Sequence, residues 1–186
     1  LINSKKHEEM IFKIFENGFE VKKVKEKNIK INNNNLNFYK WNLPFFESGI
    51  YGKKPSFYLD KNQTNIFFIS GSGLLFKFNT QNLEKDRIKI YNIKTNLIEL
   101  INDAKFYHDA YLSIKDILID GDYIYLSYSK KSKQDCYNTS LLRGKINEKQ
   151  IEFEIIFDPK ECSKINPVSG GGRIVKFDSS NFFLTI

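Results

Sequence analysis

A spacing of 58 residues between similar hairpins constrains the fold of this chain more than any other feature of its sequence. Three segments share a pattern of strand, aspartate, short turn and apolar strand: FYLD with NIFFIS in residues 57–70, ILID with YIYLS in residues 117–127, and IVKFD with NFFLT in residues 174–185. In each hairpin we expect the Asp side chain to begin the turn by binding its own backbone. A constant period indicates repeated architecture.

The repeat is long enough for a four-stranded antiparallel sheet with one long loop, so the sequence predicts an all-β fold made of β-propeller blades. The second unit is the most complete, with strands expected at residues 114–119, 123–129, 140–146 and 151–157 and a polar loop around residues 130–138. The first unit adds strands at residues 74–78 and 87–93. The alternative is an antiparallel sandwich, whose strands also alternate and turn at such intervals.

Two regions follow from this interpretation. Residues 1–45 form a leading segment, with a short helix expected in residues 4–19 and strands at 21–31 and 36–43, and it could be an incomplete blade. Residues 46–186 hold two nearly complete blades and the start of a third. Because the chain stops within an apolar strand, which would present an unpaired edge, we expect a fragment with more sequence after Ile186.

The formal net charge of +7 comes almost entirely from lysines that are scattered between apolar residues. Such spacing is typical of solvated strand faces, whereas a nucleic-acid groove needs clustered Lys and Arg with aromatic platforms. We therefore expect no nucleic-acid partner. No stretch reaches the length of a transmembrane helix, so no membrane span is expected either. The sequence does not indicate the oligomeric state.

The two cysteines, Cys136 and Cys162, flank an expected strand pair and could meet across it. A disulfide is the favoured interpretation, and it indicates a periplasmic or secreted protein whose signal segment is not in this chain. Two reduced cysteines in a cytosolic interaction module are the alternative. No Cys/His cluster exists, and His7 and His108 are far apart in sequence, so we predict no metal site from these residues.

Four motifs follow one another in the second half of the chain: DYIYLSYS at residues 122–129, TSLLRGKI at 139–146, IIF at 155–157 and GGGRIVKFD at 170–178. Over residues 114–186 this succession resembles the glucose/sorbosone dehydrogenase family. The resemblance implies a six-bladed propeller, of which this chain is an incomplete part, with pyrroloquinoline quinone (PQQ) and calcium at its mouth. It implies a divergent quinoprotein that oxidises an aldose sugar. The alternative is a non-catalytic propeller that binds a glycan or a protein partner.

The resemblance places Arg173 at the family's Gly-Gly-Arg motif, where its planar donor fork would bind a quinone carbonyl or carboxylate. A structural role is equally open, in which Arg173 pairs with an Asp such as Asp178 or with backbone carbonyls. The family's catalytic His lies four residues before this Arg, and this chain has Ser169 there. Losing a general base of this kind costs about 10²–10⁴ in rate, so whether the chain is an enzyme stays open. His108 is a weaker candidate for the base, and the glycines at 170–172 are expected to permit close backbone approach.

Overall fold

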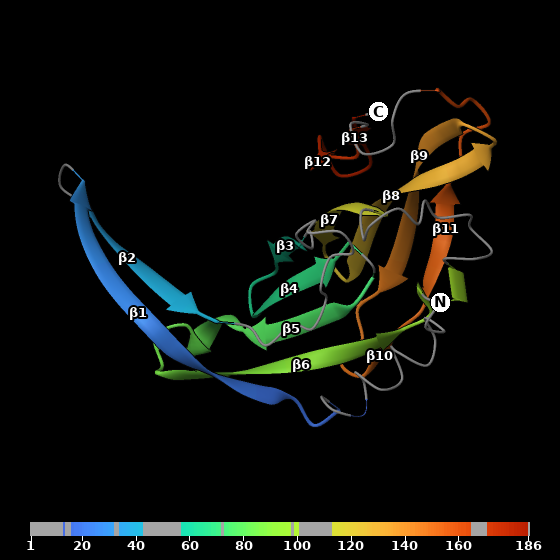
Figure 1. Cartoon of the computed structure of the whole chain (residues 1–186). Coiled ribbons are helices and arrows are strands. Elements are labelled where there is room, and N and C mark those ends of the chain that lie inside the picture. The colour runs from blue at the N-terminus through green and yellow to red at the C-terminus, as the bar shows by residue number, and fades with distance from the viewer. Residues whose placement is uncertain are drawn as a thin grey trace.

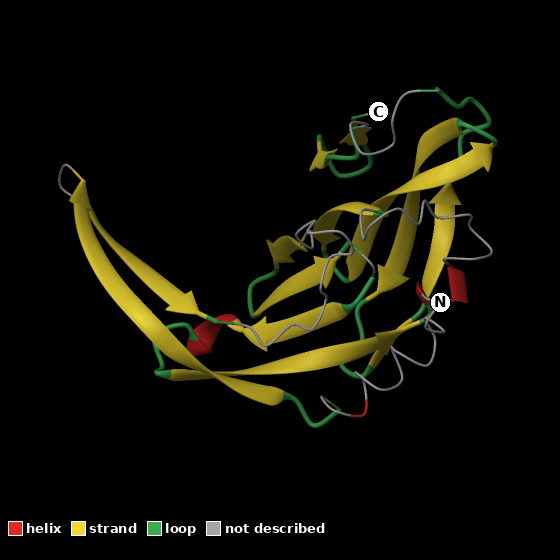
Figure 2. Ribbon diagram, in the orientation of Figure 1, coloured by secondary structure: helices red, strands yellow, loops and turns green. Residues whose placement is uncertain are grey.

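The computed structural model describes residues 13, 16–31, 34–42, 57–71, 73–97, 99–100, 113–164 and 171–185. In these residues the chain is mostly β-strand, in curved antiparallel sheets (Figure 1, Figure 2). The fold is all-β, as the repeat predicts. The strands, in chain order, are β1 (Phe19–Ile31), β2 (Asn34–Trp41), β3 (Phe57–Lys61), β4 (Asn65–Ser70), β5 (Leu75–Asn79), β6 (Arg87–Thr95), β7 (Ile114–Asp120), β8 (Tyr123–Lys133), β9 (Cys136–Lys145), β10 (Gln150–Ile151), β11 (Phe153–Phe157), β12 (Ile174–Lys176) and β13 (Phe182–Leu184).

The first blade is an antiparallel meander of β3, β4, β5 and β6. Asn62 builds the turn between β3 and β4, because its Oδ1 accepts hydrogen bonds from the backbone N–H groups of Thr64 (3.0 Å) and Asn65 (2.8 Å). Asn79 caps the 3-10 helix η2 (Thr80–Asn82) between β5 and β6 in the same way. Short polar side chains thus satisfy the turn amides and let the strands reverse.

The second blade repeats this order with β7, β8, β9 and β11. The expected polar loop at residues 130–138 was wrong, because β8 and β9 continue as a paired ribbon as far as Lys133 and Cys136. Asp135 closes the ribbon with a positive φ of 54°. Aspartate tolerates this conformation, so a very short turn suffices. The polar residues of this stretch indicate a loop by composition, yet polar side chains fit an exposed two-stranded ribbon equally well.

The blades meet through their first strands. β3 lies beside β7, and β12 of the β12–β13 hairpin lies against β7 (Figure 1). Further out, β10 pairs in parallel with the end of β6, so the second blade also contributes to the sheet of the first. Blades that follow one another with their first strands adjacent are the arrangement of a β-propeller. The described residues contain two such blades and one hairpin of a third.

The main hydrophobic core fills the space between the first and second blades. Alternate residues of β4, β5, β8 and β9 point into it, as the period of two in a strand requires. The intervening residues Phe68 and Phe76 point to the opposite face of the first blade, where their rings stack with centroids 5.2 Å apart. The first blade is therefore buried on both faces. The main core comprises Phe67, Ile69, Leu75, Ile93, Leu97, Ile114, Ile117, Ile124, Leu126, Tyr128, Leu142, Ile151 and Phe153.

A long hairpin of β1 and β2 attaches to the outer edge of the first blade, and its strands match the two expected in the leading segment. β1 pairs with β6 only from Phe19 to Lys22, and beyond a bulge it pairs with β2 alone. Most of the helix expected in residues 4–19 lies outside the described residues. The division of the chain at residue 45 stays a prediction.

Candidate functional site

Arg173 lies just before β12, at the junction of the second and third blades. Its backbone is fixed, because Arg173 N donates to Thr185 Oγ1 at 2.9 Å and Thr185 N donates to Arg173 O at 3.0 Å. Its side chain is 74% exposed. The chain therefore presents a guanidinium to solvent from a rigid attachment point.

The carboxylate that pairs with Arg173 belongs to Asp116 of β7, not to Asp178. Asp116 is buried, and its Oδ2 accepts a hydrogen bond from Ile174 N at 2.8 Å and lies 3.5 Å from Arg173 Nε. Asp178 instead holds its own turn, where hydrogen bonds from Ser180 N and Asn181 lower the pKa of its carboxyl group. Asp116 thus orients one edge of the guanidinium and leaves the rest accessible.

Gly171 and Gly172 permit close backbone approach, as predicted, and Gly172 is the one that lies against the second blade. Gly172 has a φ of +119°, and a Cβ added there would lie 2.4 Å from the Cβ of Lys115. Ser127 Oγ donates a hydrogen bond to Gly172 O from the second blade. A Cβ on Gly171 would lie 2.6 Å from the backbone of Thr185. Both positions exclude a side chain unless the backbone shifts.

Lys115 is a site residue that the sequence reasoning missed. It lies on β7 beside Asp116, against Gly172, and burial lowers the pKa of its ammonium group. The signal in the sequence was a lysine within the apolar first strand of a blade. A second cross-blade ion pair joins Lys176 Nζ to Asp120 Oδ1. The junction therefore combines cations and carboxylates from two blades, an arrangement that suits a polar ligand with a carboxylate or carbonyl group.

Ser169 and His108, the two residues considered for the catalytic base, lie outside the described residues. The predicted disulfide between Cys136 and Cys162 is confirmed, with Cα atoms 5.4 Å apart. It ties the start of β9 to the segment that follows β11. Beside it, the backbones of Tyr137 and Ser163 exchange two hydrogen bonds of 2.8 Å.

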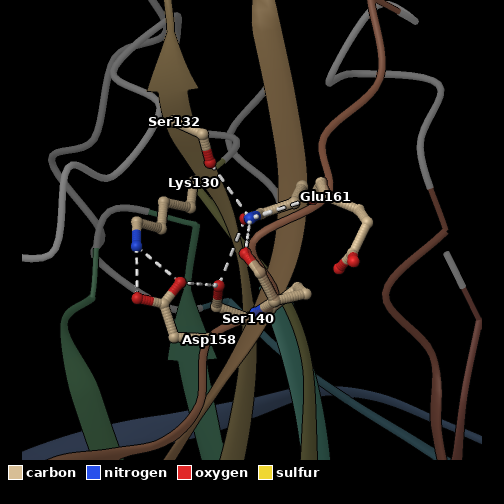
Figure 3. Close-up of polar contacts among 7 residues, drawn as sticks. Lys130, Ser132, Ser140, Asp158 and Glu161 are labelled. Carbon is tan, nitrogen blue, oxygen red and sulfur yellow. Dashed lines mark hydrogen bonds and ion pairs between the residues drawn. The ribbon is translucent and has the colours of Figure 1, made fainter.

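A second polar cluster lies near the disulfide and joins the segment after β11 to the β8–β9 ribbon (Figure 3). Asn138 is its centre, since its side-chain Nδ2 donates to Ser132 Oγ (3.0 Å) and to the backbone oxygens of Pro159 (2.7 Å) and Glu161 (3.4 Å). Ser140 Oγ donates to Asn138 Oδ1, and Lys130 forms an ion pair with Asp158. These polar groups satisfy one another's hydrogen bonds, so the cluster holds the segment after β11 against the β8–β9 ribbon rather than binding a ligand.

Among the described residues, no three His, Cys, Asp or Glu side chains gather as metal ligands. No helix in that part of the chain is long and apolar enough to cross a membrane. Comparisons with protein-family models, with curated proteins and with solved structures gave no significant match for this chain.

Proposed function

We propose that this chain is a ligand-binding β-propeller module whose site is centred on Arg173. The observation that carries the proposal is a guanidinium that is 74% exposed, whose backbone is held by Thr185 and whose Nε lies 3.5 Å from Asp116 Oδ2. A pre-oriented planar fork binds carboxylate and carbonyl oxygens through paired hydrogen bonds. Asp116 lies on β7, and side chains placed by strands keep such geometry well.

The ligand class that fits is a small acidic molecule or an acidic glycan. Lys115 lies next to Asp116 on β7 with its Cβ and Cγ against Gly172, and partial burial of its ammonium group would strengthen an interaction with a carboxylate. PQQ, which the family resemblance implies, carries carboxylates and quinone carbonyls that suit Arg173. The described residues provide no cluster of acidic ligands for calcium, so calcium rests on the resemblance alone.

The second candidate is oxidation of an aldose with bound PQQ, and the lowered pKa of Lys115 favours it. PQQ held by Arg173 would supply the oxidising power for converting the aldose to a lactone, and a base of the chain would take the C1 hydroxyl proton. Burial lowers the pKa of the Lys115 ammonium group, which makes its amine easier to deprotonate than that of an exposed lysine, and an amine is a better proton acceptor than a serine hydroxyl. The chain's own contribution is to orient the ligand through Arg173 and to hold that proton.

Calorimetric titration of the full chain with PQQ, with and without calcium, and with oligosaccharides of a uronic acid tests both candidates. Arg173→Ala should weaken binding of the responding ligand by at least about ten-fold, because a charge-assisted bidentate contact is lost. Arg143→Ala is the matched control, since Arg143 is an exposed arginine of the second blade that pairs with Glu154 at 2.6 Å. Equal affinities of wild type and Arg173→Ala would refute the site.

Dye reduction with a panel of aldoses then separates the two candidates. PQQ binding with sugar-dependent dye reduction, lost in Lys115→Met, supports the oxidoreductase. Binding of a uronate or of PQQ without any reduction supports the binding module. If none of these ligands binds the wild type, both candidates fail for this ligand class.

A periplasmic or secreted location is part of the proposal. It rests on the disulfide between Cys136 and Cys162, because disulfides persist in oxidising compartments. The location can be checked by labelling the protein's thiols in intact cells and comparing the result with labelling in a reduced lysate. Protection of both cysteines from labelling is the expected result, and two labelled cysteines would contradict it.

A further inference from the structure

The hairpin of β1 and β2 projects from the body of the molecule (Figure 1, Figure 2). We call residues 23–31 and 34–41 the arm. β1 leaves the sheet of the first blade after Lys22, and the paired residues from Lys27 to Ile31 lie opposite β2 only. In the view of Figure 1 the end of the arm stands well apart from the blades.

The base of the arm is firmly anchored. Lys23 N donates to Asp86 O at 2.7 Å, and Lys23 Nζ donates to Glu84 O at 3.2 Å. The same ammonium lies 4.9 Å from the ring centroid of Tyr39 on the opposite strand. Trp41 packs against the buried side chains on the same face of the first blade as Phe68 and Phe76. These contacts fix the direction in which the arm leaves the body.

One face of the arm is apolar near its end. Residues directly opposite each other in an antiparallel pair point to the same side, and the pairs Ile29↔Leu36 and Lys27↔Phe38 therefore share a face with Ile31. The exposed fractions of Ile31, Leu36 and Phe38 are 51%, 42% and 52%. The opposite face is polar, with Asn28, Lys30, Asn35 and Asn37. An amphipathic hairpin that exposes three large apolar side chains indicates a surface that receives them.

Cations lie beside the apolar residues on the same face. Lys27 lies beside Phe38, and Lys40 is two residues further along β2, so both flank the apolar residues on the side of the body. The arm contains five lysines and one glutamate in total, and it has no arginine. An apolar face flanked by lysines suits an anionic membrane surface, where acyl chains lie beneath negative headgroups.

We propose that the arm binds anionic lipid membranes by laying this apolar face in the interfacial layer. A nucleic-acid duplex would leave the three apolar side chains in water. A second copy of the chain is also a poorer occupant, because two chains of net charge +7 repel each other.

Co-flotation of the full chain with vesicles tests this proposal. The wild type should bind vesicles of mixed phosphatidylcholine and phosphatidylglycerol, and should bind pure phosphatidylcholine far more weakly. Lys27→Glu should reduce binding by at least about five-fold, since one lysine near such a surface contributes that factor. The double variant Leu36→Thr with Phe38→Thr should reduce it by at least about ten-fold, through lost apolar burial.

Phe183→Thr is the matched control for Phe38→Thr, because Phe183 is an equally large, 60% exposed side chain on β13. Its vesicle binding should equal that of the wild type, and the arm variants should keep the wild-type melting temperature. Equal losses for Phe38→Thr and Phe183→Thr would overturn the proposal. The proposal would also fail if the chain bound DNA but not vesicles and the double variant kept that DNA binding. It would fail likewise if light scattering showed a dimer that the double variant dissociates.

Discussion

The carboxylate of Asp116 accepts a hydrogen bond from the backbone N–H of Ile174 at 2.8 Å, across the junction between the second and third blades. The preceding junction has a similar contact, in which Asp60 Oδ2 accepts from Ile119 N at 2.6 Å. Each donor belongs to the first strand of a blade. An aspartate of one blade therefore satisfies an amide of the next, which fixes the spacing of the first strands and positions Arg173 beside Asp116.

Replacing Asp116 should destabilise the fold. In Asp116→Ala the hydrogen bond to Ile174 N is lost within a buried junction, so we expect a loss of about 2–3 kcal/mol in the free energy of unfolding. Urea denaturation measures it. Asp122→Ala is the control, because Asp122 is exposed and its described hydrogen bond uses the backbone oxygen. Equal effects of the two variants would show that the junction contact contributes nothing specific.

Adding a methyl group at Gly172 should cost more than adding one at Gly121, although both glycines have positive φ angles. Gly172→Ala meets Lys115 Cβ at 2.4 Å, whereas a Cβ at Gly121 meets nothing within 4 Å. Backbone strain and overpacking together predict a loss of about 2–4 kcal/mol for Gly172→Ala, against about 1–2 kcal/mol from strain alone for Gly121→Ala. Thermal denaturation of the two variants compares them. The reverse order would contradict the close approach of the blades.

The disulfide should contribute substantially to stability. It closes a loop with a sequence separation of 26, for which the chain-entropy model gives about 3–4 kcal/mol. The double variant Cys136→Ser with Cys162→Ser should unfold at correspondingly lower urea concentration, and reductant should shift the wild type in the same direction. If the wild type unfolds at the same urea concentration after its disulfide has been verifiably reduced, the disulfide does not contribute this stability.

The stability of the fold should fall at high pH through Tyr128. Burial raises the pKa of its phenol from 10.0 to about 12, an effect that the Ser140 side chain opposes and the negative charge of Asp158 strengthens. The unfolded chain ionises at the lower value. The contribution of Tyr128 is therefore complete below pH 10 and is lost as the pH rises to about 12, by up to roughly 2–3 kcal/mol.

The measurement for Tyr128 is urea denaturation at several pH values, for wild type and for Tyr128→Phe. Lysines also titrate in this range, but both proteins contain the same lysines, so their effect cancels in the comparison. As the pH rises from 10 to 12, the free energy of unfolding of the wild type should fall relative to that of Tyr128→Phe. A difference that stays constant over this range contradicts the raised pKa.

The strand order of both blades could be predicted from the sequence, because alternating apolar residues and turn signals are local properties. The ion-pair partner of Arg173 could not be predicted in this way. Asp116 lies far from it in sequence, and only the packing of one blade on the next brings the two together. The same limit applies to Asp60, which was expected to bind its own turn. Its Oδ1 does accept from Lys61 N, yet its Oδ2 reaches Ile119 in the next blade, and Asn62 builds the turn.

The central claim is that successive blades are joined by an aspartate that binds a first-strand amide. Amide hydrogen exchange, read by NMR on the labelled full chain, tests it most directly at Ile119 and Ile174. Both amides should be protected in the wild type. Asp60→Ala should accelerate exchange at Ile119 and not at Ile174, and Asp116→Ala should do the opposite. Fast exchange of both amides in the wild type, or no residue-specific response to either variant, would contradict the account.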